Sequence, residues 1–156
     1  MKNKITQLAN QLMQKKWRIC TAESCTGGLI AKSFTDLAGS SDWFERGFVT
    51  YSNQAKIDML GVGEKTLAEF GAVSEQVASQ MVAGALQHSN AQIAVAVTGI
   101  AGPGGGSPVK PVGTVWIGYA FGTELITELK VYSGDREEIR QLICQRAIDQ
   151  LLLLTA

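Results

Sequence analysis

Apolar positions recur at two spacings along the chain, and each spacing predicts one kind of element. Ile5, Leu8 and Leu12 lie three to four residues apart, which is typical of an amphipathic helix over 3–16. Alternating or β-branched runs predict strands instead. The expected helices are 3–16, 27–37, 54–60, one starting at Ser74, and 136–154, which Asp135 is expected to cap. The expected strands are 18–22, 44–51, 92–97, 113–121 and 124–132.

The order of these elements predicts the fold class. It reads α, β, α, β, α, α, α, β, β, β, α, which counts one more helix between the strands 44–51 and 92–97 than the spans above, with no internal repeat and no linker. Residues 92–97 (QIAVAV) are apolar at nearly every position, which favours a central strand covered on both faces. We therefore expect 1–156 to form a single α/β domain, a three-layer α/β/α arrangement around a mixed sheet.

Composition and net charge argue against nucleic-acid-binding and membrane-associated functions. The chain has 156 residues, 46% of them hydrophobic, and its formal net charge is zero, so we expect no nucleic-acid or membrane-surface partner. The first residues lack the continuous apolar core of a signal peptide, and no apolar run approaches the roughly 20 residues that span a bilayer. We expect a cytoplasmic protein, and the LLLL run at 151–154 favours a homodimer or a higher homo-oligomer.

The cysteine and histidine counts limit which metal sites, disulfides and nucleophile–base pairs the chain can form. Three cysteines without a C-x-x-C pair make a disulfide framework or a zinc site improbable, so we expect no metal. The only histidine, His88, lies in a polar stretch and is expected at the surface. A serine or cysteine nucleophile would therefore need a base other than histidine.

Ser24 is the first candidate for chemistry. It follows a predicted strand and precedes Gly27 and Gly28, which are expected to open a helix. Free N–H groups at a helix start can hold the oxyanion of an acyl-transfer reaction, and glycines let a substrate approach the backbone. The alternative is that Ser24 only caps the helix. Neighbouring Cys25 is a weaker nucleophile candidate because cysteine nucleophiles usually pair with histidine.

Lys56 is the candidate base. It would lie in the first turn of a helix capped near Ser52 and Asn53, where the helix dipole and burial would both disfavour its ammonium form. Tyr51, at the end of the preceding strand, could relay a proton or orient the lysine. The alternative is an exposed lysine beside a tyrosine at the edge of the core.

A glycine-rich loop follows the most apolar strand. Thr98 to Gly106 contains neither a Walker A motif nor a dinucleotide fingerprint, yet it lies where open α/β sheets bind ligands. Its backbone amides could cradle phosphate or polar groups, and the alternative is a mobile loop. Arg136 and Arg140 lie one turn apart on the last helix, where they could bind a phosphate or pair with Glu137 and Glu138.

Six segments closely resemble the CinA C-terminal domain family, in order and over almost the whole chain. They are AESCTGG (22–28), GSSDWFERGFVTYSNQAK (39–56), GAVSEQV (71–77), VTGIAGPGGG (97–106), KPVGTVWIG (110–118) and GDREEIR (134–140). The resemblance implies an α/β/α fold and hydrolysis of the carboxamide of nicotinamide mononucleotide, without a cofactor. It also implies that Ser24, Tyr51 and Lys56 are the catalytic residues.

These lines of reasoning give one set of expected site residues and two rival functions. Ser24 is the expected nucleophile, with Lys56 and Tyr51 as its base system. The expected substrate-binding residues are Thr26, Gly27, Thr98, Gly99, Gly102, Gly104, Gly105, Arg136 and Arg140. The rival functions are a catalytically silent pyridine-nucleotide-binding or regulatory module, and an amidase that acts on another small amide.

Overall fold

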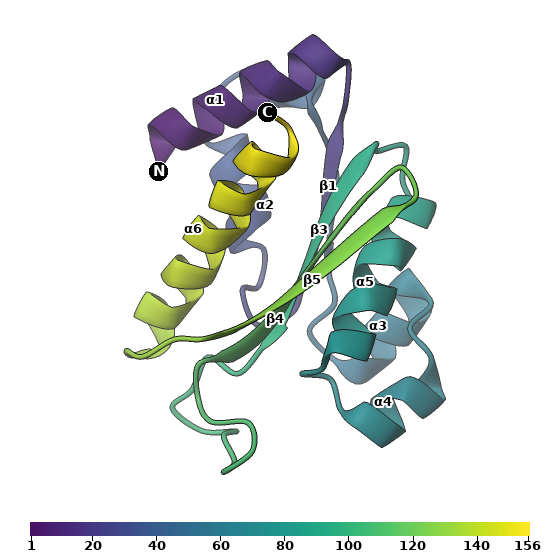
Figure 1. Ribbon diagram of the computed structural model, residues 1–156, viewed down its shortest axis with the longest axis vertical. Helices are drawn as coiled ribbons and strands as arrows, with labels where there is room; N and C mark the ends of the chain where they lie inside the picture. The colour runs from purple at the N-terminus through teal and green to yellow at the C-terminus, as the bar shows by residue number, and fades with distance from the viewer.

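A five-stranded mixed sheet divides the protein into three layers, as the computed structural model of residues 1–156 shows (Figure 1). Its strands are β1 (Ile19–Glu23), β2 (Phe44–Val49), β3 (Ile93–Gly99), β4 (Thr114–Phe121) and β5 (Glu124–Val131). The helices are α1 (Lys2–Lys15), α2 (Leu29–Thr35), α3 (Asn53–Leu60), α4 (Glu64–Phe70), α5 (Glu75–Gln87) and α6 (Arg136–Leu154). The predicted order and fold class are therefore confirmed.

Sheet topology decides where a ligand can bind. The strand order is β2-β1-β3-β4-β5; β1 is parallel to both β2 and β3, and the last two strands are antiparallel additions. The chain leaves β1 toward one neighbour and returns to the other, so the carboxyl ends of β1 and β3 form a topological switch point. In open α/β sheets that point is the usual ligand crevice.

Side-chain size differs between the two faces of the sheet. One face carries large apolar residues such as Ile19 and Val95, which pack with α1, α2 and α6 (Figure 1). The other face carries small residues such as Ala94 and Ala96, so that α5 packs closely against it. Alternation along β1 and β3 thus assigns each residue to one of two cores, as expected of strands buried on both sides.

Short polar side chains set the helix starts that matter for the site. The hydroxyl of Ser52 accepts a hydrogen bond from Ala55 N at the start of α3, and Asp135 with Glu138 forms a capping box on α6. Both caps were predicted from the sequence. The helix predicted over 27–37 is shorter, because Gly27 and Gly28 adopt positive φ and α2 begins only at Leu29.

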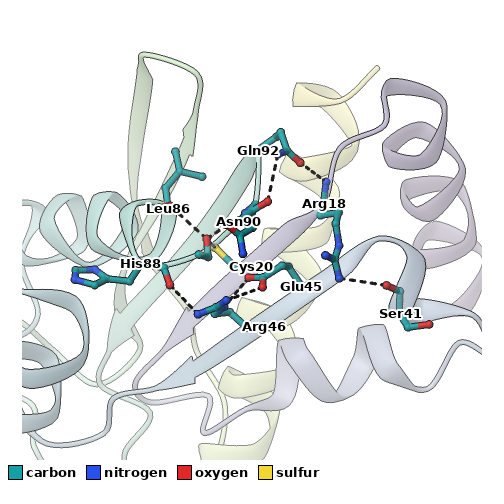
Figure 2. Close-up of polar contacts among 11 residues, drawn as sticks. Arg18, Cys20, Ser41, Glu45, Arg46, Leu86, His88, Asn90 and Gln92 are labelled. Carbon is teal, nitrogen blue, oxygen red and sulfur yellow. Dashed lines mark hydrogen bonds and ion pairs between the residues drawn. The ribbon is translucent and has the colours of Figure 1, made fainter.

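The amino ends of the parallel strands are joined by polar contacts (Figure 2). Gln92 accepts a hydrogen bond from Arg18 N at 2.8 Å, which ties the start of β3 to the start of β1. Arg46 pairs with Glu45 and donates to the backbone oxygen of His88, which ties β2 to the end of α5. This network lies at the edge of the sheet opposite the switch point, and His88 is exposed there, as predicted.

Most of the C-terminal leucines pack against the core of the same chain. Leu151 is fully buried, Leu152 and Leu154 pack against the core, and only Leu153 is largely exposed, at 69%. A lone exposed leucine is ordinary on a protein surface, so this run no longer argues for an interface. The homo-oligomer stays a prediction. None of the helices is both long and apolar enough to cross a membrane.

Candidate active site

A cavity of about 290 Å³ opens at the carboxyl edge of the sheet, between the ends of β1 and β3. It collects residues from five separate parts of the chain. They are Ser24, Cys25, Tyr51, Asn53, Lys56, Ala72, Val73, Thr98, Gly99, Ile100, Ala101, Gly102, Gly104, Gly105 and Arg136. The size suits a small ligand or part of one, and the wall is mixed apolar and polar, as small-molecule sites are.

Ser24 is held firmly at the mouth of this cavity. Its backbone N–H donates to Val97 O at 3.0 Å, which continues the β1–β3 pairing by one residue. Its side chain is nearly buried, and Lys56 Nζ donates to its Oγ at 3.0 Å. A hydroxyl and an amine separated by 32 positions in sequence are therefore in hydrogen-bond contact, the geometry that nucleophile activation requires.

Glu23 is the site residue that sequence reasoning missed. Its buried carboxylate accepts hydrogen bonds from Thr26 Oγ1 at 2.7 Å, Ile30 N at 2.9 Å and Ala31 N at 3.0 Å. It therefore occupies the N-terminus of α2, the place where we had expected an oxyanion to bind. The available signal was an acidic residue ending an otherwise buried strand just before a helix.

The N–H groups left for an oxyanion lie in the turn between Ser24 and Gly27. Ser24 N donates to Val97 O and Gly27 N donates to Ser24 O, so neither is free. These two N–H groups are therefore not available to an oxyanion, and the prediction of an oxyanion site at this turn rests on the N–H groups between them. Cys25 N and Thr26 N have no acceptor within the protein, which leaves them as the candidate donors.

Lys56 is among the most deeply buried side chains of the protein, with 1% of its surface exposed. Its Nζ donates to the backbone oxygens of Thr50 at 2.8 Å, Tyr51 at 3.2 Å and Ser52 at 3.5 Å, besides Ser24 Oγ. Burial lowers the pKa of Lys56 below its usual value. The amine is thus fixed by main-chain oxygens and pushed toward the neutral form.

Burial is the cause of this lowered pKa, as predicted. Nζ donates to the carbonyl oxygens of Thr50 and Tyr51, which precede the start of α3. Carbonyl oxygens accept hydrogen bonds from an ammonium and favour it, so these contacts act against the lowering. The predicted contribution of the helix dipole stays a prediction.

Tyr51 contributes its backbone oxygen rather than its phenol to the lysine. Its side chain is 62% exposed, and its hydroxyl accepts a hydrogen bond from Arg136 Nη2 at 3.1 Å. No hydrogen bond joins the phenol to Ser24 or Lys56. A proton relay through Tyr51 stays a prediction with no direct contact behind it, and the phenol lies instead at the cavity rim.

Arg136 and Arg140 have different surroundings, although the sequence predicted the same role for both. Arg136 lines the cavity and donates to Gly102 O at 2.8 Å. Arg140 does not line it, and donates to Cys25 O at 3.1 Å and Thr26 O at 2.8 Å. Neither forms an ion pair with an acidic residue of α6, so the surface-pairing alternative does not hold for either arginine.

The glycine-rich segment forms one wall of the cavity, as predicted. Gly99, Gly102, Gly104 and Gly105 all line it. Thr98 is buried and its hydroxyl donates to Ala72 O at 2.8 Å, which ties β3 to the segment before α5. That segment, Ala72 and Val73, also lines the cavity and was not predicted, because two small apolar residues in a loop carry no chemical signal.

Cys25, His88 and the acidic side chains do not form a second catalytic or metal site. Burial raises the pKa of the Cys25 thiol to about 11, so the reactive thiolate is disfavoured near neutral pH. His88 lies at the opposite edge of the sheet (Figure 2). No three His, Cys, Asp or Glu side chains meet in an arrangement that could hold a metal ion.

Fold and site together define a class: a three-layer α/β/α protein with a serine–lysine pair in the crevice at the carboxyl edge of its sheet. The chain belongs to the CinA C-terminal domain family, whose model matches residues 2–155. Sequence resemblance had already pointed to this family, and the match confirms it.

Two amidohydrolases are similar to this chain over most of their length, and one longer protein is similar over part of its length. The chain is 57% identical over 135 residues to a nicotinamide-nucleotide amidohydrolase PncC of Enterobacter agglomerans, covering 86% of this chain and 82% of that protein. It is 53% identical over 146 residues to the protein of the same name from Escherichia coli K12, covering 93% and 88%. A CinA-like protein of Akkermansia muciniphila is 56% identical, but the match spans only 34% of that longer protein.

Solved structures agree with the fold. The competence/damage inducible protein CihA from Agrobacterium tumefaciens superposes with a TM-score of 0.92 at 48% identity, covering 98% of this chain and 96% of that one. A CinA superfamily protein from Escherichia coli superposes with a TM-score of 0.95 at 36% identity, covering 98% and 89%. The arrangement of layers described above is thus that of the family.

Proposed function

We propose that this protein hydrolyses the carboxamide of nicotinamide mononucleotide, giving nicotinate mononucleotide and ammonia, with Ser24 as nucleophile and Lys56 as base. The observation that carries the proposal is the 3.0 Å contact between Lys56 Nζ and Ser24 Oγ in a largely buried site. The names of relatives that are 53–57% identical over most of their length support the substrate.

The surroundings of Lys56 suit a neutral amine that accepts a proton. A neutral amine has two N–H donors and one lone pair. The backbone oxygens of Thr50 and Tyr51, at 2.8 and 3.2 Å, can take the two donors, which leaves the lone pair for the hydroxyl of Ser24. In that state Ser24 donates to Lys56, the direction that activates the hydroxyl for attack.

The reaction follows from these placements. Ser24 Oγ attacks the carboxamide carbon while its proton passes to Lys56, and the carbonyl oxygen becomes an oxyanion held by the N–H groups of Cys25 and Thr26. The C–N bond then breaks, and the Lys56 ammonium returns the proton so that ammonia leaves. Water attacks the resulting ester by the same route, giving the carboxylate and restoring Ser24.

Arg136 is the residue best placed for the phosphate of the substrate. It is the one guanidinium on the cavity wall, and it lies beside the exposed phenol of Tyr51 at the rim. Guanidinium groups bind phosphate through paired N–H donors, and the glycines at 102, 104 and 105 leave the neighbouring backbone open. The carboxamide would then point inward to Ser24 and the phosphate outward.

Ammonia release from nicotinamide mononucleotide tests this proposal. Ser24→Ala and Lys56→Met should each lower kcat at least about 100-fold, since each removes a group that takes part in bond making. Lys65→Met, at an exposed lysine of α4, is the matched control and should leave the rate unchanged. Activity that persists in both site variants would refute the assignment.

Calorimetry beside the rate assay separates the rival functions. A silent binding module would bind nicotinamide mononucleotide and release no ammonia. An amidase with another substrate would release ammonia from a different small amide, which a panel of nicotinamide derivatives with and without phosphate would reveal. The proposed enzyme should favour the phosphate-bearing compound, because only that compound reaches Arg136.

A further inference from the structure

Arg140 is a cation next to the active site that the reaction described above does not use. It comes from the second turn of α6, and its guanidinium reaches the loop after β1 rather than the cavity. Nε donates to Cys25 O at 3.1 Å and Nη2 donates to Thr26 O at 2.8 Å. No acidic side chain pairs with it, so its polar contacts are to two consecutive peptide carbonyls.

Those two carbonyls belong to the turn that carries the free N–H groups. In a trans peptide the C=O and the following N–H point in opposite directions. Holding Cys25 O on the α6 side therefore directs Thr26 N–H away from the guanidinium. Holding Thr26 O fixes the next peptide in the same way, and its N–H, on Gly27, is already bound to Ser24 O at 3.0 Å.

We propose that Arg140 is a positioning residue that orients the Cys25–Thr26 peptide so that its N–H faces the oxyanion formed at Ser24. This inference rests on the proposed function. Arg140 touches no substrate atom; it acts through the turn it holds. A cation on a peptide oxygen also polarises that peptide, so the N–H becomes a stronger donor. Glu23 holds the same turn through a second contact, the hydrogen bond that it accepts from Thr26 Oγ1.

The contrast with Arg136 gives the proposal its test. Arg136 lies on the cavity wall, so its loss should raise KM for nicotinamide mononucleotide. Loss of a whole oxyanion donor lowers kcat about 100- to 1000-fold, and a donor that is only poorly oriented should cost less. Arg140 contacts the turn and not the cavity, so Arg140→Met should lower kcat by about 10- to 100-fold and change KM by less than about threefold. Arg140→Lys keeps the charge but cannot bridge both carbonyls, and should give an intermediate kcat.

A second readout keeps the inference separate from the substrate assignment. A fluorophosphonate labels an activated serine: Ser24 Oγ attacks phosphorus through a five-coordinate transition state while its proton passes to Lys56, and fluoride leaves as the P–F bond breaks. The negative charge on the phosphoryl oxygen uses the same N–H donors. The rate of Ser24 labelling, followed by mass spectrometry, should fall in Arg140→Met and stay unchanged in the exposed control Lys65→Met. Urea unfolding of every variant shows whether the chain is folded, and Arg140→Lys carries the test if Arg140→Met is not.

The outcomes are distinct. If the wild type releases ammonia and Arg140→Met retains its kcat and its labelling rate, the positioning role is refuted and the proposed function stands. If the wild type releases no ammonia, the proposed function fails, and slower labelling of Arg140→Met still supports the positioning role. A rise in KM equal to that of Arg136→Met would make Arg140 a substrate-binding residue and overturn the inference.

Discussion

Replacing Glu23 by glutamine tests the turn on which the whole site depends. The substitution keeps the size of the side chain and removes only its charge and one acceptor oxygen. In the wild type, one carboxylate oxygen accepts from Thr26 Oγ1 and Ile30 N, and the other accepts from Ala31 N. In the variant, the amide nitrogen would face one of these donors with a donor of its own.

The cost can be worked from these three hydrogen bonds. Two of them survive in neutral form and lose about 1 kcal/mol each, since hydrogen bonds to charged groups are roughly twice as strong. The third is lost and leaves Ala31 N unsatisfied, at about 1–3 kcal/mol. Relief from burying a charge offsets part of this sum. We expect Glu23→Gln to lower the free energy of unfolding by about 2–4 kcal/mol, against a usual total of about 5–15 kcal/mol.

Urea unfolding followed by tryptophan fluorescence measures this change. The matched control is Glu69→Gln, the same chemical change at an exposed carboxylate of α4 that makes no hydrogen bond. Ammonia release should also fall in Glu23→Gln, because Thr26 loses its strongest anchor. A free energy of unfolding within about 0.5 kcal/mol of the control would refute the view that Glu23 organises the turn, since surface changes usually stay within that range.

Three further predictions follow from burial. Because burial lowers the pKa of Lys56 below 10.5, ammonia release should rise with pH and level off before 10.5. The unfolded chain keeps the Lys56 proton up to higher pH, so the stability difference in urea between the wild type and Lys56→Met should move in favour of the wild type as pH rises toward 10.5, and a difference that does not change with pH would contradict this. Because burial raises the pKa of Cys25 to about 11, the thiol should not take part in catalysis near neutral pH, and Cys25→Ala should retain most of the ammonia release. Rapid inactivation of the wild type by iodoacetamide near neutral pH would contradict the view that this thiol is unreactive. A Cβ at Gly84 would overlap the backbone oxygen of Leu60, so Gly84→Ala should destabilise by at least about 1–3 kcal/mol in urea unfolding, whereas Gly104→Ala, with open space around it, should not.

The fold was largely predictable because it depends on patterns that are local in sequence. Strand alternation, helical spacing and the caps at Ser52, Ser74 and Asp135 each act over a few residues, and the structure confirms them. The error at the start of α2 has a physical reason. Gly27 and Gly28 adopt positive φ and form a turn, which propensity alone does not distinguish from a helix start.

By itself, the sequence determined the order of elements, the two-sided burial of the central strands and the residue types available for catalysis. It also supplied the candidate serine and lysine, because a chain with one histidine has few other bases. Only the tertiary structure decided which of these residues meet. Lys56 and Ser24 are brought together by the parallel pairing of β2 with β1, and burial there sets the charge of the amine. The separate placements of Arg136 and Arg140 likewise depend on how α6 packs, and no local pattern records that.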